Sequence, residues 1–136
     1  MKRIIATALV GLLAAPAFAD GDAAKGEKAF RKCKSCHVIV APDGTAIVKG
    51  GKTGPNLYGI IGKPAGSVEG FKYSDSLKAA GEAGLVWDKD NFVAWTKNPK
   101  KFLKEHTGDP KAKSKMTFKL RKGAEDIYAY LESVSQ

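Results

Sequence analysis

Apolar and polar positions along the chain predict a few helices separated by long irregular segments. Asp22 suits a helix N-cap, and Ala23, Gly26, Phe30 and Cys33 then follow on one helical face. Near the other end, the most regular helical pattern in the chain covers residues 124–133. Its apolar positions recur every three or four residues, at Ile127, Tyr128, Leu131 and Val134.

The middle of the chain predicts two further helices that meet at a proline. Asp88 can cap a helix with Phe92, Val93 and Trp95 inward, and this helix should end at Asn98-Pro99. The reason is that the residue before a proline resists helical dihedral angles. Proline itself suits the first turn of a helix, because its missing N–H is not needed there. A second helix should therefore begin at this proline, with Phe102 and Leu103 inward.

The remaining chain is mostly irregular. Residues 38–70 hold eight glycines and three prolines, which predicts an extended loop, and only a weak helical pattern covers 74–80. No stretch shows the sustained alternation of a strand. The predicted fold is therefore all-α, with few helices and long loops wrapped around something that fills the centre.

The first nineteen residues are typical of a signal peptide rather than of a fold. Lys2 and Arg3 form a positive start, residues 4–13 are almost unbroken apolar sequence, and Ala17-Phe18-Ala19 ends the segment. Small residues at these positions predict cleavage before Asp20. The apolar run is too short to span a bilayer.

Cleavage there would leave residues 20–136 as a single exported domain, most simply in a bacterial periplasm. The chain carries 23 basic and 14 acidic residues, and loss of the leader lowers its net charge from +9 to +7. In an exported protein this charge points away from nucleic acid. It favours steering toward an acidic protein surface or an anionic membrane face.

Cys33-Lys34-Ser35-Cys36-His37 is a C-x-x-C-H pentapeptide that contains both cysteines of the chain. Two thiols at this spacing can add to the two vinyl groups of one haem, and the following imidazole can then reach the iron. A thioredoxin-type redox pair is an alternative, but it expects a βαβ context. A zinc site would need more ligands, and only His106 and carboxylates remain.

Met116 is the candidate for the sixth iron ligand. It is the one methionine left after cleavage, and it lies in Lys115-Met116-Thr117-Phe118 rather than on an apolar helical face. A thioether opposite an imidazole raises the reduction potential and suits iron that binds no substrate. His106 is the rival ligand, but its polar neighbours at 104–109 favour a solvated loop histidine.

Seven motifs between residues 20 and 136 together carry a family resemblance. They are Cys33–His37, Thr53–Gly59, Gly70–Asp75, Trp87, Asn98–Lys101, Lys115–Phe118 and Glu125–Leu131. On these residues the chain resembles the class I cytochromes c, and within them the bacterial group called cytochrome c2. The resemblance implies one haem c attached through Cys33 and Cys36. It also implies axial ligation by His37 and Met116, with the Pro55 carbonyl accepting the second ring N–H of the histidine.

The resemblance also implies contacts to the haem propionates. Tyr73 and Trp87 would hydrogen-bond a propionate, with help from Ser114 where the family often has threonine. Lys63 stands where an arginine commonly meets the inner propionate, so a bidentate contact would be lost.

Two further positions depart from the family pattern. Trp95 replaces a tyrosine that many relatives place near the methionine sulfur, and Leu77 replaces a polar residue that often orders a buried water. Both differences would change the reduction potential rather than the fold.

With both axial positions filled, the expected function is outer-sphere electron transfer by a monomeric, non-enzymatic carrier. The resemblance implies a cytochrome bc complex as donor and a photosynthetic reaction centre or terminal oxidase as acceptor. A haem enzyme or gas-binding protein with a displaceable sixth ligand is the alternative. The basic residues expected to surround the exposed haem edge and bind acidic partners are Lys32, Lys34, Lys52, Lys100, Lys101, Lys119, Arg121 and Lys122.

Overall fold

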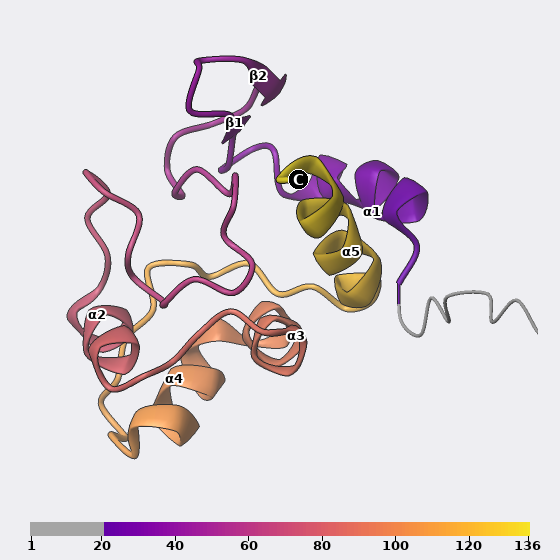
Figure 1. Ribbon diagram of the computed structural model, residues 1–136. Coiled ribbons are helices and arrows are strands. Elements are labelled where there is room, and N and C mark those ends of the chain that lie inside the picture. Colours follow the sequence, from indigo (N-terminus) through magenta and orange to yellow (C-terminus); the bar gives the residue numbers. More distant parts are fainter. Residues whose placement is uncertain (1–20) are drawn as a thin grey trace, which may run out of the picture.

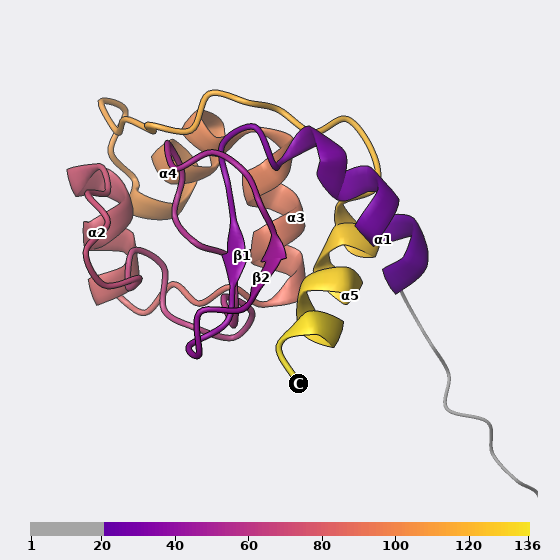
Figure 2. The same cartoon turned by 90° about the horizontal axis from the view of Figure 1, so that it is seen from above.

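The computed structural model describes residues 21–136, so the predicted signal peptide and its cleavage position lie outside the described part. Helices and long loops surround the centre of the molecule (Figures 1 and 2). A cavity lies there, lined by side chains from several of these elements. The elements in chain order are α1 (Ala23–Ala29), the 3-10 helix η1 (Phe30–Lys32), β1 (Ile39–Val40), β2 (Ala46–Val48), α2 (Asp75–Glu82), α3 (Lys89–Lys97), α4 (Pro99–Thr107) and α5 (Ala124–Val134).

Side-chain caps account for the starts of four helices. Asp22, Ser74, Asp88 and Asn98 each accept a hydrogen bond from a backbone N–H in the first turn of α1, α2, α3 and α4. These bonds satisfy N–H groups that have no partner inside the helix. The predicted helices are confirmed, and the weak pattern at 74–80 corresponds to α2. Helix α5 instead begins after Gly123, whose φ of +87° suits glycine.

The prediction of a strandless loop over 38–70 was wrong at one place. Strands β1 and β2 form a two-stranded antiparallel sheet with an irregular register. The two strands are only two and three residues long, which is too short for an alternation of apolar and polar positions to show in the sequence. The turn between them holds the pair together, because Ala41 N–H donates to the Thr45 carbonyl at 2.9 Å and Thr45 N–H donates to Asp43 at 2.9 Å. Apart from this hairpin, the expected all-α fold with long loops is confirmed.

Helices α1 and α5 cross side by side, joining the two ends of the described chain (Figures 1 and 2). A Cβ on Gly26 would collide with the carbonyl of Asp126, so glycine permits the close approach of the backbones. Phe30 packs on Tyr130 with ring centroids 5.8 Å apart, and Ile127 is fully buried in the same contact. The backbone N–H of Asp22 also donates to the Asp126 carboxylate at 2.8 Å.

Helices α2, α3 and α4 form the other side of the molecule (Figure 2). The loop before α2 is tied to the chain before α3, since Trp87 N–H donates to the Lys63 carbonyl at 2.9 Å and Gly62 N–H donates to the Trp87 carbonyl at 2.8 Å. Leu103 on α4 is fully buried, while Phe102 is half-buried. Within residues 21–136, no helix is long and apolar enough to cross a membrane.

Candidate functional site

A cavity of about 240 Å³ lies between the two helical groups. Its walls come from residues 30–37, the loop 53–60, the segment 71–77, α3, and the segment 115–120, with Ile127 added from α5. One water needs only about 15 Å³, and protein cores are close-packed. A mainly apolar space of this size in so small a domain therefore fits a large, flat, apolar group.

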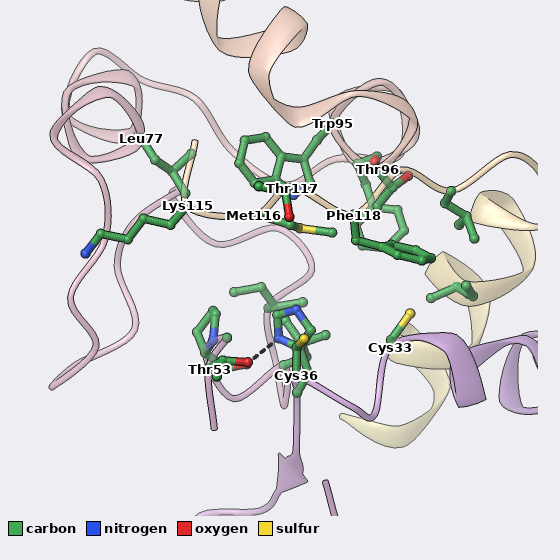
Figure 3. Close-up of a pocket in the computed structure, with 18 of the residues that line it drawn as sticks. Cys33, Cys36, Thr53, Leu77, Trp95, Thr96, Lys115, Met116, Thr117 and Phe118 are labelled. Atoms are coloured by element: carbon green, nitrogen blue, oxygen red, sulfur yellow. Dashed lines mark hydrogen bonds between the residues drawn. The ribbon is translucent and has the colours of Figure 1, made fainter. Parts of the chain in front are cut away.

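The two thiols lie together on one side of this cavity. Helix η1 ends at Cys33, and the His37 N–H donates back to the Cys33 carbonyl at 3.0 Å. This turn places Cys33, half-buried, and Cys36, exposed, beside the imidazole of buried His37. Figure 3 shows both sulfurs on the same side of the cavity, which is what attachment to two vinyl groups of one macrocycle requires.

The structure argues against the two other uses of this cysteine pair. Burial raises the pKa of the Cys33 thiol to about 11, aided by Cys36 and opposed by Lys32, whereas redox-active cysteines have a lowered pKa. Residues 21–136 also contain no group of three or more His, Cys, Asp or Glu side chains that could hold a metal ion. The zinc alternative is therefore not supported.

His37 is held in a defined orientation. Its Nδ1 lies 2.8 Å from the Pro55 carbonyl, so Nδ1 carries the proton and donates, which leaves Nε2 as the free lone pair. Burial lowers the pKa of His37, and the bond to Pro55 opposes that shift, so the neutral form that binds metals is favoured. Gly54 packs on the ring, because a Cβ there would lie 2.6 Å from Nδ1.

Met116 lies across the cavity from Cys33 and Cys36 (Figure 3). It is half-buried, on the irregular segment between α4 and α5. The Ser114 hydroxyl donates to the Met116 carbonyl at 2.8 Å. Ser114 lies in a neighbouring surface groove and does not line the cavity, so its contact with a propionate stays a prediction.

Tyr73 and Trp87 both line the cavity, as the resemblance implied. The Tyr73 hydroxyl accepts from the Val68 N–H at 3.1 Å, which leaves its own proton free to donate. Burial raises the pKa of Tyr73 more than the bond from Val68 lowers it, so the tyrosine keeps that proton. Trp95 and Leu77 also line the wall, and the rings of Trp87 and Trp95 are 5.4 Å apart.

Lys63, the rival ligand His106 and one residue that the sequence analysis missed can now be placed. Lys63 is exposed and outside the lining, near Gly59. His106 is exposed and stacks on Phe102 with ring centroids 5.4 Å apart, so it is not a cavity residue. The sequence analysis missed buried Thr96, which lines the wall one helical turn after Phe92. That spacing is the signal that could have identified it.

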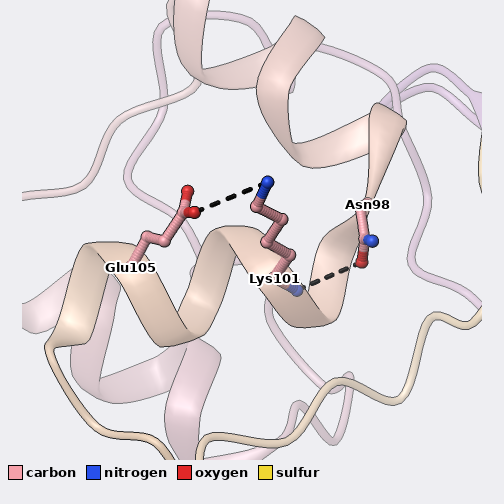
Figure 4. Close-up of polar contacts among 3 residues, drawn as sticks. All are labelled: Asn98, Lys101 and Glu105. Atoms are coloured by element: carbon pink, nitrogen blue, oxygen red, sulfur yellow. Dashed lines mark hydrogen bonds and ion pairs between the residues drawn. The ribbon is translucent and has the colours of Figure 1, made fainter.

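The predicted partner-binding basic residues are all exposed. Lys32 lies at the cavity wall beside Cys33, whereas Lys100, Lys101 and Lys119 border one surface groove next to Met116. Lys101 also forms an ion pair with Glu105, with Nζ and Oε1 3.8 Å apart (Figure 4). The structure therefore brings three of the eight predicted basic residues together in one groove. Lys34, Lys52, Arg121 and Lys122 are exposed but not part of that groove.

The fold and this cavity define a haem protein of the c type, in which the macrocycle is bonded to the chain. The chain matches no protein-family model. It is 60% identical to cytochrome c-551 of Roseobacter denitrificans, over 99% of this chain and 97% of the relative. It is 59% identical to cytochrome c2 of Rhodobacter capsulatus, over 95% of this chain and 93% of the relative. The solved structure of that cytochrome c2 superposes with a TM-score of 0.83 at 58% identity, covering 85% of this chain and all of the other.

The chain therefore belongs to the class I cytochromes c, and within that class to the cytochrome c2 type. It is an electron carrier with one haem c, attached through Cys33 and Cys36. The residues present fit a haem. Two thiols and one oriented imidazole lie on one side of an apolar cavity, and a methionine lies on the other.

Proposed function

We propose that His37 and Met116 bind the haem iron from its two sides and that the protein works as a periplasmic electron carrier, not as an enzyme. Bound haem supplies a reversible one-electron couple. The observation that carries the proposal is the position of Met116 across the cavity from the C-x-x-C-H turn, with Nε2 of His37 left free by the bond to Pro55. Two protein ligands leave no position for a substrate.

The surrounding residues would set the potential. Ile60, Leu77, Trp87, Phe92 and Trp95 exclude water from the cavity. A low local dielectric disfavours the more positive ferric state, and a thioether ligand favours the ferrous state, so both raise the reduction potential. Tyr73 can hold a propionate by donating its free hydroxyl proton.

We infer that the partners present acidic faces. The groove bordered by Lys100, Lys101 and Lys119 adjoins Met116, so a partner bound there would lie close to the haem. The fitting partners are a cytochrome bc complex as donor and a photosynthetic reaction centre or terminal oxidase as acceptor. Opposite charges would speed encounter while the contact itself stays small and short-lived.

Carbon monoxide binding to the reduced holoprotein at neutral pH tests this proposal. We expect none, because Met116 would keep the sixth position closed, and we expect rapid electron exchange with purified partner complexes. Ready binding of the gas by wild-type protein would instead support a haem enzyme or gas-binding protein. His106, the other histidine among the described residues, does not line the cavity and stacks on Phe102, which supports the carrier over an enzyme with a distal acid–base histidine.

A further inference from the structure

The wall of the haem cavity contains one buried hydroxyl. Apart from tryptophan and tyrosine, the buried polar side chains within residues 21–136 are those of His37 and Thr96, and both line the cavity. Burial of His37 has a reason, because its imidazole is a proposed iron ligand. That reason does not apply to Thr96. This residue is 8% exposed and lies on the side of the cavity that carries Trp95 and Met116 (Figure 3).

The proton of the Thr96 hydroxyl is held by the backbone of its own helix. Thr96 Oγ1 donates to the Phe92 carbonyl at 2.9 Å and to the Val93 carbonyl at 3.1 Å, one turn earlier in α3. A hydroxyl has one proton and two lone pairs, so no second proton is left to donate. The lone pairs point away from the two carbonyls. Toward the cavity, the hydroxyl can therefore act only as an acceptor.

Helix α3 does not need this hydroxyl for its own stability. Both acceptor carbonyls lie inside the helix, where each also accepts the backbone N–H four residues later. A threonine that bonds back to its own helix slightly destabilises that helix. Valine has the same branched shape and would be buried without the cost of removing a hydroxyl from water. Packing alone therefore favours an apolar residue at position 96.

We propose that Thr96 lowers the reduction potential of the haem, by turning the negative end of its hydroxyl dipole toward the ring. The haem is more positive in its ferric state, so a nearby negative end stabilises that state. The effect is strong in a cavity from which water is excluded. It opposes the effect of the apolar wall and of Met116, which raise the potential. The inference rests on the proposed carrier function, but it holds whichever side chains bind the iron.

Redox titration of the Thr96→Val holoprotein tests this inference. Valine keeps the shape of threonine, and no backbone group loses its only partner. At a fixed applied potential, the ratio of ferrous to ferric protein should rise by about threefold, near the lower end of what one hydrogen bond contributes. For a one-electron couple this ratio corresponds to an increase of about 30 mV. The increase should be the same between about pH 5 and pH 8, because threonine does not titrate there.

Two further variants control for packing and for the helix. Thr96→Ser loses a methyl group but keeps the hydroxyl, so its potential should stay at the wild-type value. Thr107→Val removes a similar bond from α4, where Thr107 Oγ1 donates to the Leu103 carbonyl at 2.6 Å outside the cavity. Its potential should not change. The inference is wrong if Thr96→Val leaves the potential unchanged or lowers it, or if either control raises it equally.

The direction of the change separates this effect from damage to the site. Loss of Met116 from the iron would lower the potential, and so would water that entered through a loosened wall. An increase in Thr96→Val therefore cannot come from either kind of damage. If wild-type ferric protein lacks the sulfur-to-iron absorption band, the proposed ligand Met116 is wrong. Thr96→Val should still raise the potential in that case, so the two hypotheses can fail independently.

Discussion

Met116 gives the most direct test among single residues, because no other methionine follows the predicted leader. Met116→Ala should abolish the sulfur-to-iron absorption band of the ferric protein. The reduction potential should fall by on the order of 0.1 V or more, since axial ligands set haem potentials over roughly 0.8 V. Spectroscopy and redox titration measure both effects.

His106→Ala is the control for this experiment. Its ring stacks on Phe102 outside the cavity, so neither the band nor the potential should change. A potential that barely moves in Met116→Ala would mean that another group binds the iron.

Gly54 is a position at which the structure leaves no room for a larger residue. Gly54 lies against the His37 ring with a normal backbone conformation, so contact and not φ requires the glycine. A methyl group there would push the imidazole away from the position that its bond to Pro55 fixes. The position of His37, rather than the shape of the loop, therefore requires glycine at residue 54.

The crossing of α1 and α5 gives a prediction at the scale of elements. Gly26→Ala would improve the intrinsic helix propensity of α1 by up to about 1 kcal/mol. Its methyl group would nevertheless collide with the Asp126 carbonyl and crowd Tyr130, at a cost of roughly 3 kcal/mol or more. The net result should be a clear loss of stability, measured by denaturant unfolding of the holoprotein.

Lys25→Ala is the matched control in the same helix, because Lys25 is exposed. It should change the free energy of unfolding by no more than about 0.5 kcal/mol. Stabilisation by Gly26→Ala would contradict the close approach of the two helices.

Helix α4 carries an ion pair whose removal should affect association more than stability. Lys101 and Glu105 are 69% and 67% exposed, and their 3.8 Å separation is long for an ion pair (Figure 4). Such pairs contribute at most a few tenths of a kcal/mol. Glu105→Gln should therefore leave the free energy of unfolding within about 0.5 kcal/mol of wild type.

The same substitution removes a negative charge beside the basic groove. Association with an acidic partner should become faster at low salt, as stopped-flow kinetics would measure. Slower association would place the docking face away from α4.

The sequence could predict the features of the whole molecule that depend on local contacts. Asp22, Asp88 and Asn98 cap helices within their own first turns, so the predicted starts agree with the structure. The C-x-x-C-H turn and the methionine across the cavity were likewise predictable from motifs.

Long-range contacts explain what could not be predicted. The side chain of Asn56 bonds both the N–H and the carbonyl of Val40, at 3.0 and 2.8 Å, and these bonds tie β1 to the loop that carries Asn56. Asn56 and Val40 lie sixteen residues apart and in no repeated local pattern that a sequence reveals.

Salt dependence is the prediction for the whole molecule. With a net charge of +7 after the predicted cleavage, electron transfer to acidic partners should slow by tenfold or more between about 0.01 M and 1 M salt. Over that range the Debye length falls from roughly 30 to 3 Å. Flash or stopped-flow kinetics would measure the decline, and a flat profile would count against steering.

A comparison of Lys100→Gln with Lys25→Gln shows which part of the positive surface causes the salt dependence of electron transfer. Both residues are exposed and lose the same charge, but only Lys100 borders the groove next to Met116. The first substitution should therefore weaken the salt dependence more than the second.

The crossing of α1 and α5 also dictates when this protein can acquire its structure. The bond from Asp22 to the Asp126 carboxylate spans 104 residues, so its two halves are the first and the last parts of the domain to leave the ribosome. No growing chain can close that contact before Asp126 has been made, because the later partner does not yet exist. Until then α1 and α5 cannot pack together, and the thiols that follow α1 remain within reach of any machinery that must join a pigment to them.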